Sequence, residues 1–195
     1  ILDKSEFIDS NFITTSPDVL SFLPQKVQNY YIPNPSDPSF ETLNNYNYSC
    51  TNDVFFALSH GVHRGVLKSG KTDDRITFLN NLTSKTPDVK FDLYGIGKIQ
   101  PIWADHYFKT ISNAKMGLNL SRGEAIKYYS SDRITQIVGN GLVCLIDEKT
   151  EYRNFFNDRE MVFYKNISDL SEKILKISND EKLRKSLGQN GKNKY

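Results

Sequence analysis

Residues 119–147 read NLSRGEAIKYYSSDRITQIVGNGLVCLID, and they decide the expected fold. An apolar run ends in a Ser-Arg-Gly turn, and a serine pair, Ser130 and Ser131, then opens a short helix. That helix stops at Gly139-Asn140-Gly141, and a second apolar run begins at once. A strand, a polar loop, a helix N-terminus, a glycine and a strand in this order are typical of a doubly wound fold. Such folds bind phosphorylated ligands at the carboxyl ends of their strands.

The rest of the chain alternates short apolar runs with helical patterns. Parallel strands that are covered on both faces by helices produce this alternation. We therefore expect an α/β protein with a doubly wound, Rossmann-like parallel sheet and helices on both faces. Strands are predicted at 9–15, 27–32, 54–59, 89–94, 114–120, 142–146 and 161–164, and helices at 18–23, 73–85, 103–113, 131–138, 150–156, 168–178 and 180–190.

A proline cluster marks the expected domain boundary. Pro33, Pro35 and Pro38 exclude a helix there, and residues 36–52 are polar, rich in asparagine and without a period. We predict a remnant of an N-terminal domain at 1–32, a linker at 33–52 and one Rossmann-like α/β domain at 53–195.

The composition excludes several classes of protein. The 195 residues are 38% hydrophobic with a net charge of +2, which is too small for a dedicated nucleic-acid surface. Two cysteines form no disulfide framework and favour a reducing, cytoplasmic location. No apolar run reaches the roughly 18 residues of a membrane helix. The basic helix at 180–190 is compatible with a peripheral position at the inner membrane face, although a solvated face is the simpler interpretation. The chain has no Walker loop, GxGxxG, nucleophile elbow or CxxC pair.

The loop after the strand at 54–59 reads SHGVHRGVLKSGKTDDR and is the first candidate ligand site. Basic side chains among glycines suit a diphosphate, because glycine lets the backbone approach a ligand closely. A solvated basic loop is the alternative. The His-x-x-His pair has no evident third ligand, so no metal site is expected; these histidines either contact a phosphate or sugar oxygen or pack in the structure. The candidates here are His60, Gly61, His63, Arg64, Lys68 and Lys71.

The loop and helix at 121–136 form the second candidate site. Ser130 or Ser131 is a natural N-cap, and the free N–H groups and positive dipole end of that helix would face an anion. Tyr128 and Tyr129 either stack on a base or pack in the core, and Glu124 either binds sugar hydroxyls or is solvated. The further candidates for this site are Tyr94, Gly95, Arg122, Gly123, Asp132, Arg133 and Gln136.

Several segments in order resemble the C-terminal half of a GT-B glycosyltransferase of the group 1 type, spore-coat-like variants included. The segment 31–37 resembles the family's IPNxxD, and 91–95 resembles its strand end before a glycine. Ser131 to Gln136, with Gly141 five residues later, resembles the family's xxRhxEhhxxG helix, and the pattern in 163–184 resembles the common C-terminal ending. The resemblance covers about 28–195.

This resemblance implies a donor-binding domain for a nucleotide-diphosphate sugar, with transfer to a glycan, lipid-linked or protein acceptor, for example in cell-envelope polysaccharide synthesis. It implies that Arg64 and Lys68 stabilise the leaving diphosphate without a metal or another cofactor; Lys71 is an alternative to Lys68. The acceptor site would lie largely in an N-terminal domain, so this chain alone would bind donor and transfer little. A non-catalytic module and a GT-B-shaped epimerase are the rival functions.

The chain departs from the family at one contact. Gln136 stands where the family often has a glutamate that grips the ribose, and an amide binds a hydroxyl without charge assistance. A different register would pair Glu124 with Asp132, as the family's two acidic residues; we favour the register that is anchored by Gly141.

Overall fold

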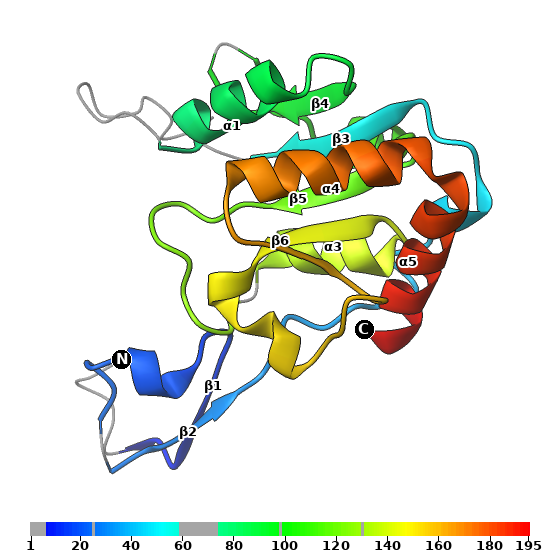
Figure 1. Cartoon of the computed structure of the whole chain (residues 1–195). Helices are drawn as coiled ribbons and strands as arrows, with labels where there is room; N and C mark the ends of the chain where they lie inside the picture. The colour runs from blue at the N-terminus through cyan, green and yellow to red at the C-terminus, as the bar shows by residue number, and fades with distance from the viewer. Residues whose placement is uncertain (1–6, 25, 59–73, 98, 130) are drawn as a thin grey trace.

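The computed structural model describes residues 7–24, 26–58, 74–97, 99–129 and 131–195 (Figure 1). Its main feature is a five-stranded sheet in which every neighbouring pair is parallel. The strand order is β4-β3-β5-β6-β7. The chain thus starts in an inner strand, moves to one edge, and returns to the other side of β3, as doubly wound sheets do. The strands are β3 (Asn52–Ala57), β4 (Phe91–Tyr94), β5 (Ala114–Asn119), β6 (Val143–Asp147) and β7 (Val162–Tyr164).

Helices cover both faces of this sheet, as expected. Alternating strand residues point to opposite faces: Val54 and Phe56 join the cluster under α1 (Asp74–Lys85) and α4 (Ile167–Asn179), whereas Phe55 joins the cluster under α2 (Ala104–Ile111) and α3 (Asp132–Gly139). In Figure 1, α4 crosses in front of the sheet and α3 lies behind it. Helix α5 (Glu181–Lys194) packs on both α4 and α3. The parallel, doubly covered sheet is therefore confirmed.

A second, two-stranded sheet precedes the main one. Strands β1 (Ser10–Ile13) and β2 (Gln28–Tyr31) pair in parallel around the short helix η2 (Pro17–Val19), and they lie apart from the larger sheet in Figure 1. The Ser16 amide donates to the Lys127 carbonyl (3.1 Å), and the Lys127 ammonium lies 2.8 Å from an Asp18 carboxylate oxygen. The small sheet is thus tied to the loop that follows β5.

Residues 33–52, which the sequence predicts to be a linker, pack closely against the main domain. They include the short helix η3 (Asn45–Asn47). Asn45 is completely buried, and its amide donates to the carbonyls of Ile111 (2.8 Å) and Ala114 (3.0 Å). The segment therefore follows a defined path across the ends of α2 and β5.

The prediction of a helix at 150–156 is wrong. Two single 3₁₀ turns, η4 (Glu148–Thr150) and η5 (Tyr152–Asn154), stand there instead. Glu151 between them has φ 55°, a left-handed conformation that an α-helix does not accommodate. The last helix, in contrast, continues to Lys194, beyond the predicted end at 190. Within the described ranges, no helix has the length and apolar character needed to cross a membrane.

Candidate functional site

A cavity of about 450 Å³ opens beside the carboxyl ends of the central strands. The connections from β3 and β5 leave the sheet there toward helices on opposite faces, α1 and α3. Ligands of open α/β sheets bind at this switch point, where no helix crosses over the strand ends. The cavity is lined by Ala57, Leu58, Ile102, Trp103, Ala104, Tyr107, Phe108, Ser131, Asp132, Arg133 and Gln136, and we call it the switch-point cavity.

Arg133 places a fixed positive charge at this cavity. From the first turn of α3 its Nη1 donates to the Leu120 carbonyl (3.2 Å) and its Nε to the Ala57 carbonyl (3.4 Å), so it joins the ends of β5 and β3. Its guanidinium carbon lies 5.0 Å from the centroid of the Phe56 ring. Burial, and then the neighbouring Arg75, lower the pKa of Arg133. An arginine nevertheless stays protonated in proteins, so the charge persists.

The N-terminus of α3 faces the same cavity. Ser131 is the N-cap, with extended backbone, but its side chain accepts no hydrogen bond from the amides of the helix in the described structure. Its Oγ instead lies 3.5 Å from Asn119 Oδ1. The first amides of a helix need acceptors and carry the positive end of the helix dipole. The end of α3 is therefore suited to an anionic group.

Tyr107 of α2 and Gln136 of α3 form a polar pair in the lining of the cavity. The Tyr107 hydroxyl donates to Gln136 Oε1 at 2.5 Å. Burial raises the pKa of Tyr107, so this phenol remains protonated and continues to donate. Gln136 Nε2 makes no hydrogen bond with any described residue. Its two N–H groups remain for a ligand in the cavity.

Residues 75–195 match a family model described as glycosyl transferase-like. The chain belongs to this glycosyl transferase-like family. The matched stretch holds α1 from its second residue, α2 to α5, and most of the lining of the switch-point cavity. The expected GT-B glycosyltransferase domain is therefore confirmed.

The crystal structure of TarM supports the fold, and a second solved structure is only a weaker match. The crystal structure of TarM has a TM-score of 0.67 and 14% identity, and the match covers 99% of this chain and 41% of that chain. Spinosyn forosaminyltransferase SpnP has a TM-score of 0.46 and 10% identity, covering 95% of this chain and 50% of SpnP. No curated protein matches the sequence significantly. This glycosyltransferase domain spans less than half of the TarM chain.

The predicted site residues of this glycosyltransferase domain are only partly brought together. Ser131, Asp132, Arg133 and Gln136 line the switch-point cavity, and the Asp132 carboxylate accepts from Asn34 Nδ2 at 3.1 Å. The other predicted residues of the basic loop and the helix start lie outside the described residues: His60, Gly61, His63, Arg64, Lys68, Lys71 and Ser130.

The remaining predicted residues do not line the switch-point cavity. Tyr128 packs between Phe155 (centroids 4.8 Å apart) and Tyr31 (5.3 Å). Glu124 is exposed, with Oε2 3.6 Å from Lys149 Nζ. The amide of Gly123 donates to Asp74 Oδ2 (2.8 Å), which holds the loop after β5 to the start of α1. Arg122 is exposed, and Tyr129 is half-buried. The rings of Tyr94 and His106 meet edge to face. Gly95 lies against Leu58, the residue that follows β3.

Sequence reasoning missed one wall of the cavity, formed by the start of α2. Trp103 and Phe108 are 52% and 40% exposed, which is high for large aromatic side chains. Ala104 between them has φ 45°. The sequence predicts a helix at 103–113 with Trp103, Tyr107 and Ile111 four residues apart. Asp105 and His106 on this helix fit a surface position better than a catalytic one. The signal that could have found this wall is the position of an aromatic cluster directly after the loop that leaves β4.

Replacing Tyr107 by phenylalanine is expected to lower the free energy of unfolding by about 1 kcal/mol, because the buried hydrogen bond to Gln136 is lost. Urea denaturation measures this change. Tyr48→Phe is the matched control, since Tyr48 is 58% exposed and its hydroxyl has no partner among the described residues. Equal stabilities of the two variants would contradict the role of the Tyr107–Gln136 pair.

Proposed function

We propose that this glycosyltransferase domain binds a nucleotide-diphosphate sugar in the switch-point cavity and presents it to an acceptor. One observation carries the proposal: the Arg133 guanidinium and the N-terminus of α3 meet at a cavity that also has aromatic side chains and an amide. A nucleotide diphosphate needs these three kinds of contact, for its charge, its base and its ribose.

The proposed arrangement follows the chemistry of the walls. The diphosphate lies at the N-terminus of α3, near the charge of Arg133. Trp103 and Phe108, which are about half exposed on the other wall, offer flat faces to the base. Gln136 Nε2 donates to a ribose hydroxyl, whereas a glutamate in its place would accept from one.

Transfer forms a bond between the anomeric carbon and an acceptor atom, whose proton passes to a base. It breaks the bond between the anomeric carbon and a diphosphate oxygen, so negative charge grows on that oxygen. Cations and amides already in place stabilise this charge and lower the barrier. We assign this role to Arg64 and Lys68 of the basic segment, which follows the cavity-lining residue Leu58 in the sequence, with Lys71 as the alternative to Lys68. With these charges we expect no metal to be required.

Most of the acceptor site and any general base are proposed to be formed by residues outside this chain, which spans 41% of TarM. The domain alone should then bind donor and transfer little. An acceptor in cell-envelope polysaccharide synthesis and a cytoplasmic location remain expectations from the resemblance and from the free cysteines, Cys50 and Cys144. Burial raises the pKa of Cys144 to about 12, so it is not a nucleophile in this mechanism.

The test is a calorimetric titration with UDP, GDP, ADP and CDP, first without metal and then with magnesium. One diphosphate is expected to bind saturably without metal. In the Arg64→Ala/Lys68→Ala variant its binding should weaken by about 2–4 kcal/mol, because two charge-assisted hydrogen bonds are lost.

Lys176→Ala/Lys182→Ala is the matched control. It removes the same charge from exposed positions on α4 and α5, which do not line the switch-point cavity. Affinity should be nearly unchanged in this control. Equal weakening in both double variants would mean that only the overall charge matters, and no binding of any diphosphate to folded protein would refute the proposal.

A further inference from the structure

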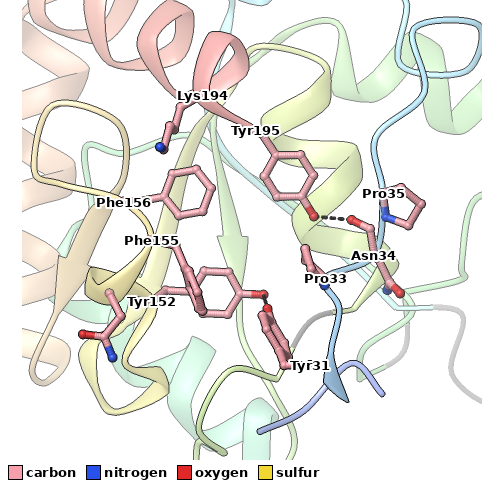
Figure 2. A pocket seen from close by; sticks show the side chains of 10 residues that line it. Tyr31, Pro33, Asn34, Pro35, Tyr152, Phe155, Phe156, Lys194 and Tyr195 are labelled. Atoms are coloured by element: carbon pink, nitrogen blue, oxygen red, sulfur yellow. Dashed lines mark hydrogen bonds between the residues drawn. The ribbon is translucent and has the colours of Figure 1, made fainter. Parts of the chain in front are cut away.

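A second cavity, of about 460 Å³, lies between the end of β2, the segment 33–35, the turn η5 and the end of α5. We call it the aromatic cavity, and Figure 2 shows its lining side chains gathered around a common space. Its rings are stacked in pairs: Tyr31 on Phe155 with centroids 5.4 Å apart, Tyr152 on Phe156 at 6.2 Å, and Phe156 on Tyr195 at 6.0 Å. It shares no lining residue with the switch-point cavity.

Hydrogen bonds fix the orientation of these rings. The hydroxyls of Tyr31 and Tyr152 lie 3.0 Å apart and bond to each other. The Tyr195 hydroxyl donates to the Asn34 carbonyl at 2.6 Å (Figure 2). Because the rings are held in this way, a ligand that stacks on them does not have to order them first.

Polar groups also line this cavity. Asn154 Nδ2 donates to the Tyr128 hydroxyl at 2.7 Å, which leaves its amide oxygen available. Lys194 is exposed, and its ammonium has no hydrogen bond or ion pair with a described residue. Tyr152 and Phe156 are buried, whereas Phe155 is 38% exposed. The cavity therefore offers mainly the face of Phe155, together with a donor and an acceptor.

Asn34 connects the two cavities. In the aromatic cavity its carbonyl accepts from Tyr195, and Thr135 Oγ1 of α3 donates to the same oxygen at 3.2 Å. Its side chain donates to Asp132, which lines the switch-point cavity. Among these contacts, only Asn34 and the first turns of α3 thus stand between the aromatic cavity and the switch-point cavity.

We propose that the aromatic cavity binds a pyranose ring of a carbohydrate acceptor. A pyranose has C–H groups on its faces, which the negative faces of aromatic rings attract, and hydroxyls around its edge, which pair with groups such as Lys194 and Asn154. A wholly apolar partner would instead remove water from these polar groups without replacing its hydrogen bonds. The identity of this ring as the acceptor rests on the proposed function, because a transferase needs its acceptor beside its donor.

Saturation-transfer NMR and calorimetry test the proposal with three pyranose tetramers: maltotetraose, chitotetraose and tetragalacturonate. They share the ring and differ in their substituents. At least one is expected to bind saturably. Phe155→Ala should weaken that binding about tenfold, since one stacking face is lost. Lys194→Ala, at an exposed position where folding is not at risk, should weaken it several-fold.

Phe40→Ala is the matched control for Phe155→Ala, because Phe40 is 66% exposed and lines neither cavity. The tetramer should bind the Phe40→Ala variant as tightly as it binds the unaltered protein. The proposal is overturned if no tetramer binds the folded protein, or if Phe155→Ala and Lys194→Ala both leave binding unchanged.

Nucleotide titrations on the same samples keep this proposal separate from the proposed function. A nucleoside diphosphate that binds while no tetramer binds refutes the aromatic cavity as a sugar site and leaves the donor proposal standing. A tetramer that binds while no diphosphate binds supports the sugar site but refutes its role as the acceptor subsite of a transferase.

Discussion

Gly95→Ala is expected to lower the free energy of unfolding by about 3–5 kcal/mol, one of the two largest effects for this domain. Gly95 has φ 70°, a conformation that costs alanine about 1–2 kcal/mol. In addition, a Cβ there would lie 1.9 Å from the Leu58 carbonyl oxygen, at the end of β3. Backbone must move to relieve this clash. Urea denaturation with circular dichroism measures the loss.

Gly97→Ala in the same loop is the control that separates strain from clash. Gly97 has φ 59°, but a Cβ there would meet nothing within 4 Å. The Gly97→Ala substitution should lower the free energy of unfolding only by the backbone strain, about 1–2 kcal/mol. Similar losses in the two variants would mean that the contact with Leu58 is unimportant. Because Leu58 lines the switch-point cavity, Gly95→Ala should also weaken nucleotide binding, whereas Gly97→Ala should not.

Arg184→Met is expected to destabilise the domain by about 3–5 kcal/mol, since two backbone carbonyls lose the donors of a buried guanidinium. Arg184 is 1% exposed. Its Nη1 donates to the Asn45 carbonyl (2.7 Å), its Nη2 to the Tyr48 carbonyl (2.7 Å), and its Nε to Glu181 Oε2 (3.0 Å). Methionine fills much of the space but leaves both carbonyls without these donors. The measurement is again urea denaturation.

Lys185→Met is the matched control on the next residue of α5. Lys185 Nζ lies 3.7 Å from the same carboxylate of Glu181, at the surface. Exposed ion pairs contribute about 0–1 kcal/mol, so this variant should be nearly as stable as the unaltered protein. If the two variants lost similar stability, the clamp of Arg184 on residues 45–48 would not hold the predicted linker in place.

The main strands and helices were predictable because each one leaves a local pattern. The alternation of Val54, Phe55 and Phe56 between two clusters is a property of a strand buried on both faces, and it is visible as an unbroken apolar run. The failure at 150–156 has a local cause too. Glu151 adopts a left-handed conformation between two short turns, and a glutamate in the sequence gives no indication of such a conformation.

The candidate site was predictable only where residues follow the end of a strand directly. Arg133 and Gln136 were found because they belong to the helix after β5, and both line the switch-point cavity. Trp103 and Tyr107 were not found, because their spacing equally fits a helix face that packs on the sheet. Tyr128 shows the reverse case: it follows a strand, but it packs on Phe155 beside the aromatic cavity.

Periodicity, the glycine at 141 and the order of motifs were thus enough to establish the α/β class and the glycosyltransferase family, since both depend on patterns within short segments. Strand order, the bridge that Arg133 makes between β5 and β3, and the link of Asn34 to both cavities depend on contacts between distant residues. Such contacts form when apolar faces from separate segments are buried together. The local pattern of a single sequence does not indicate which of these segments pack against each other.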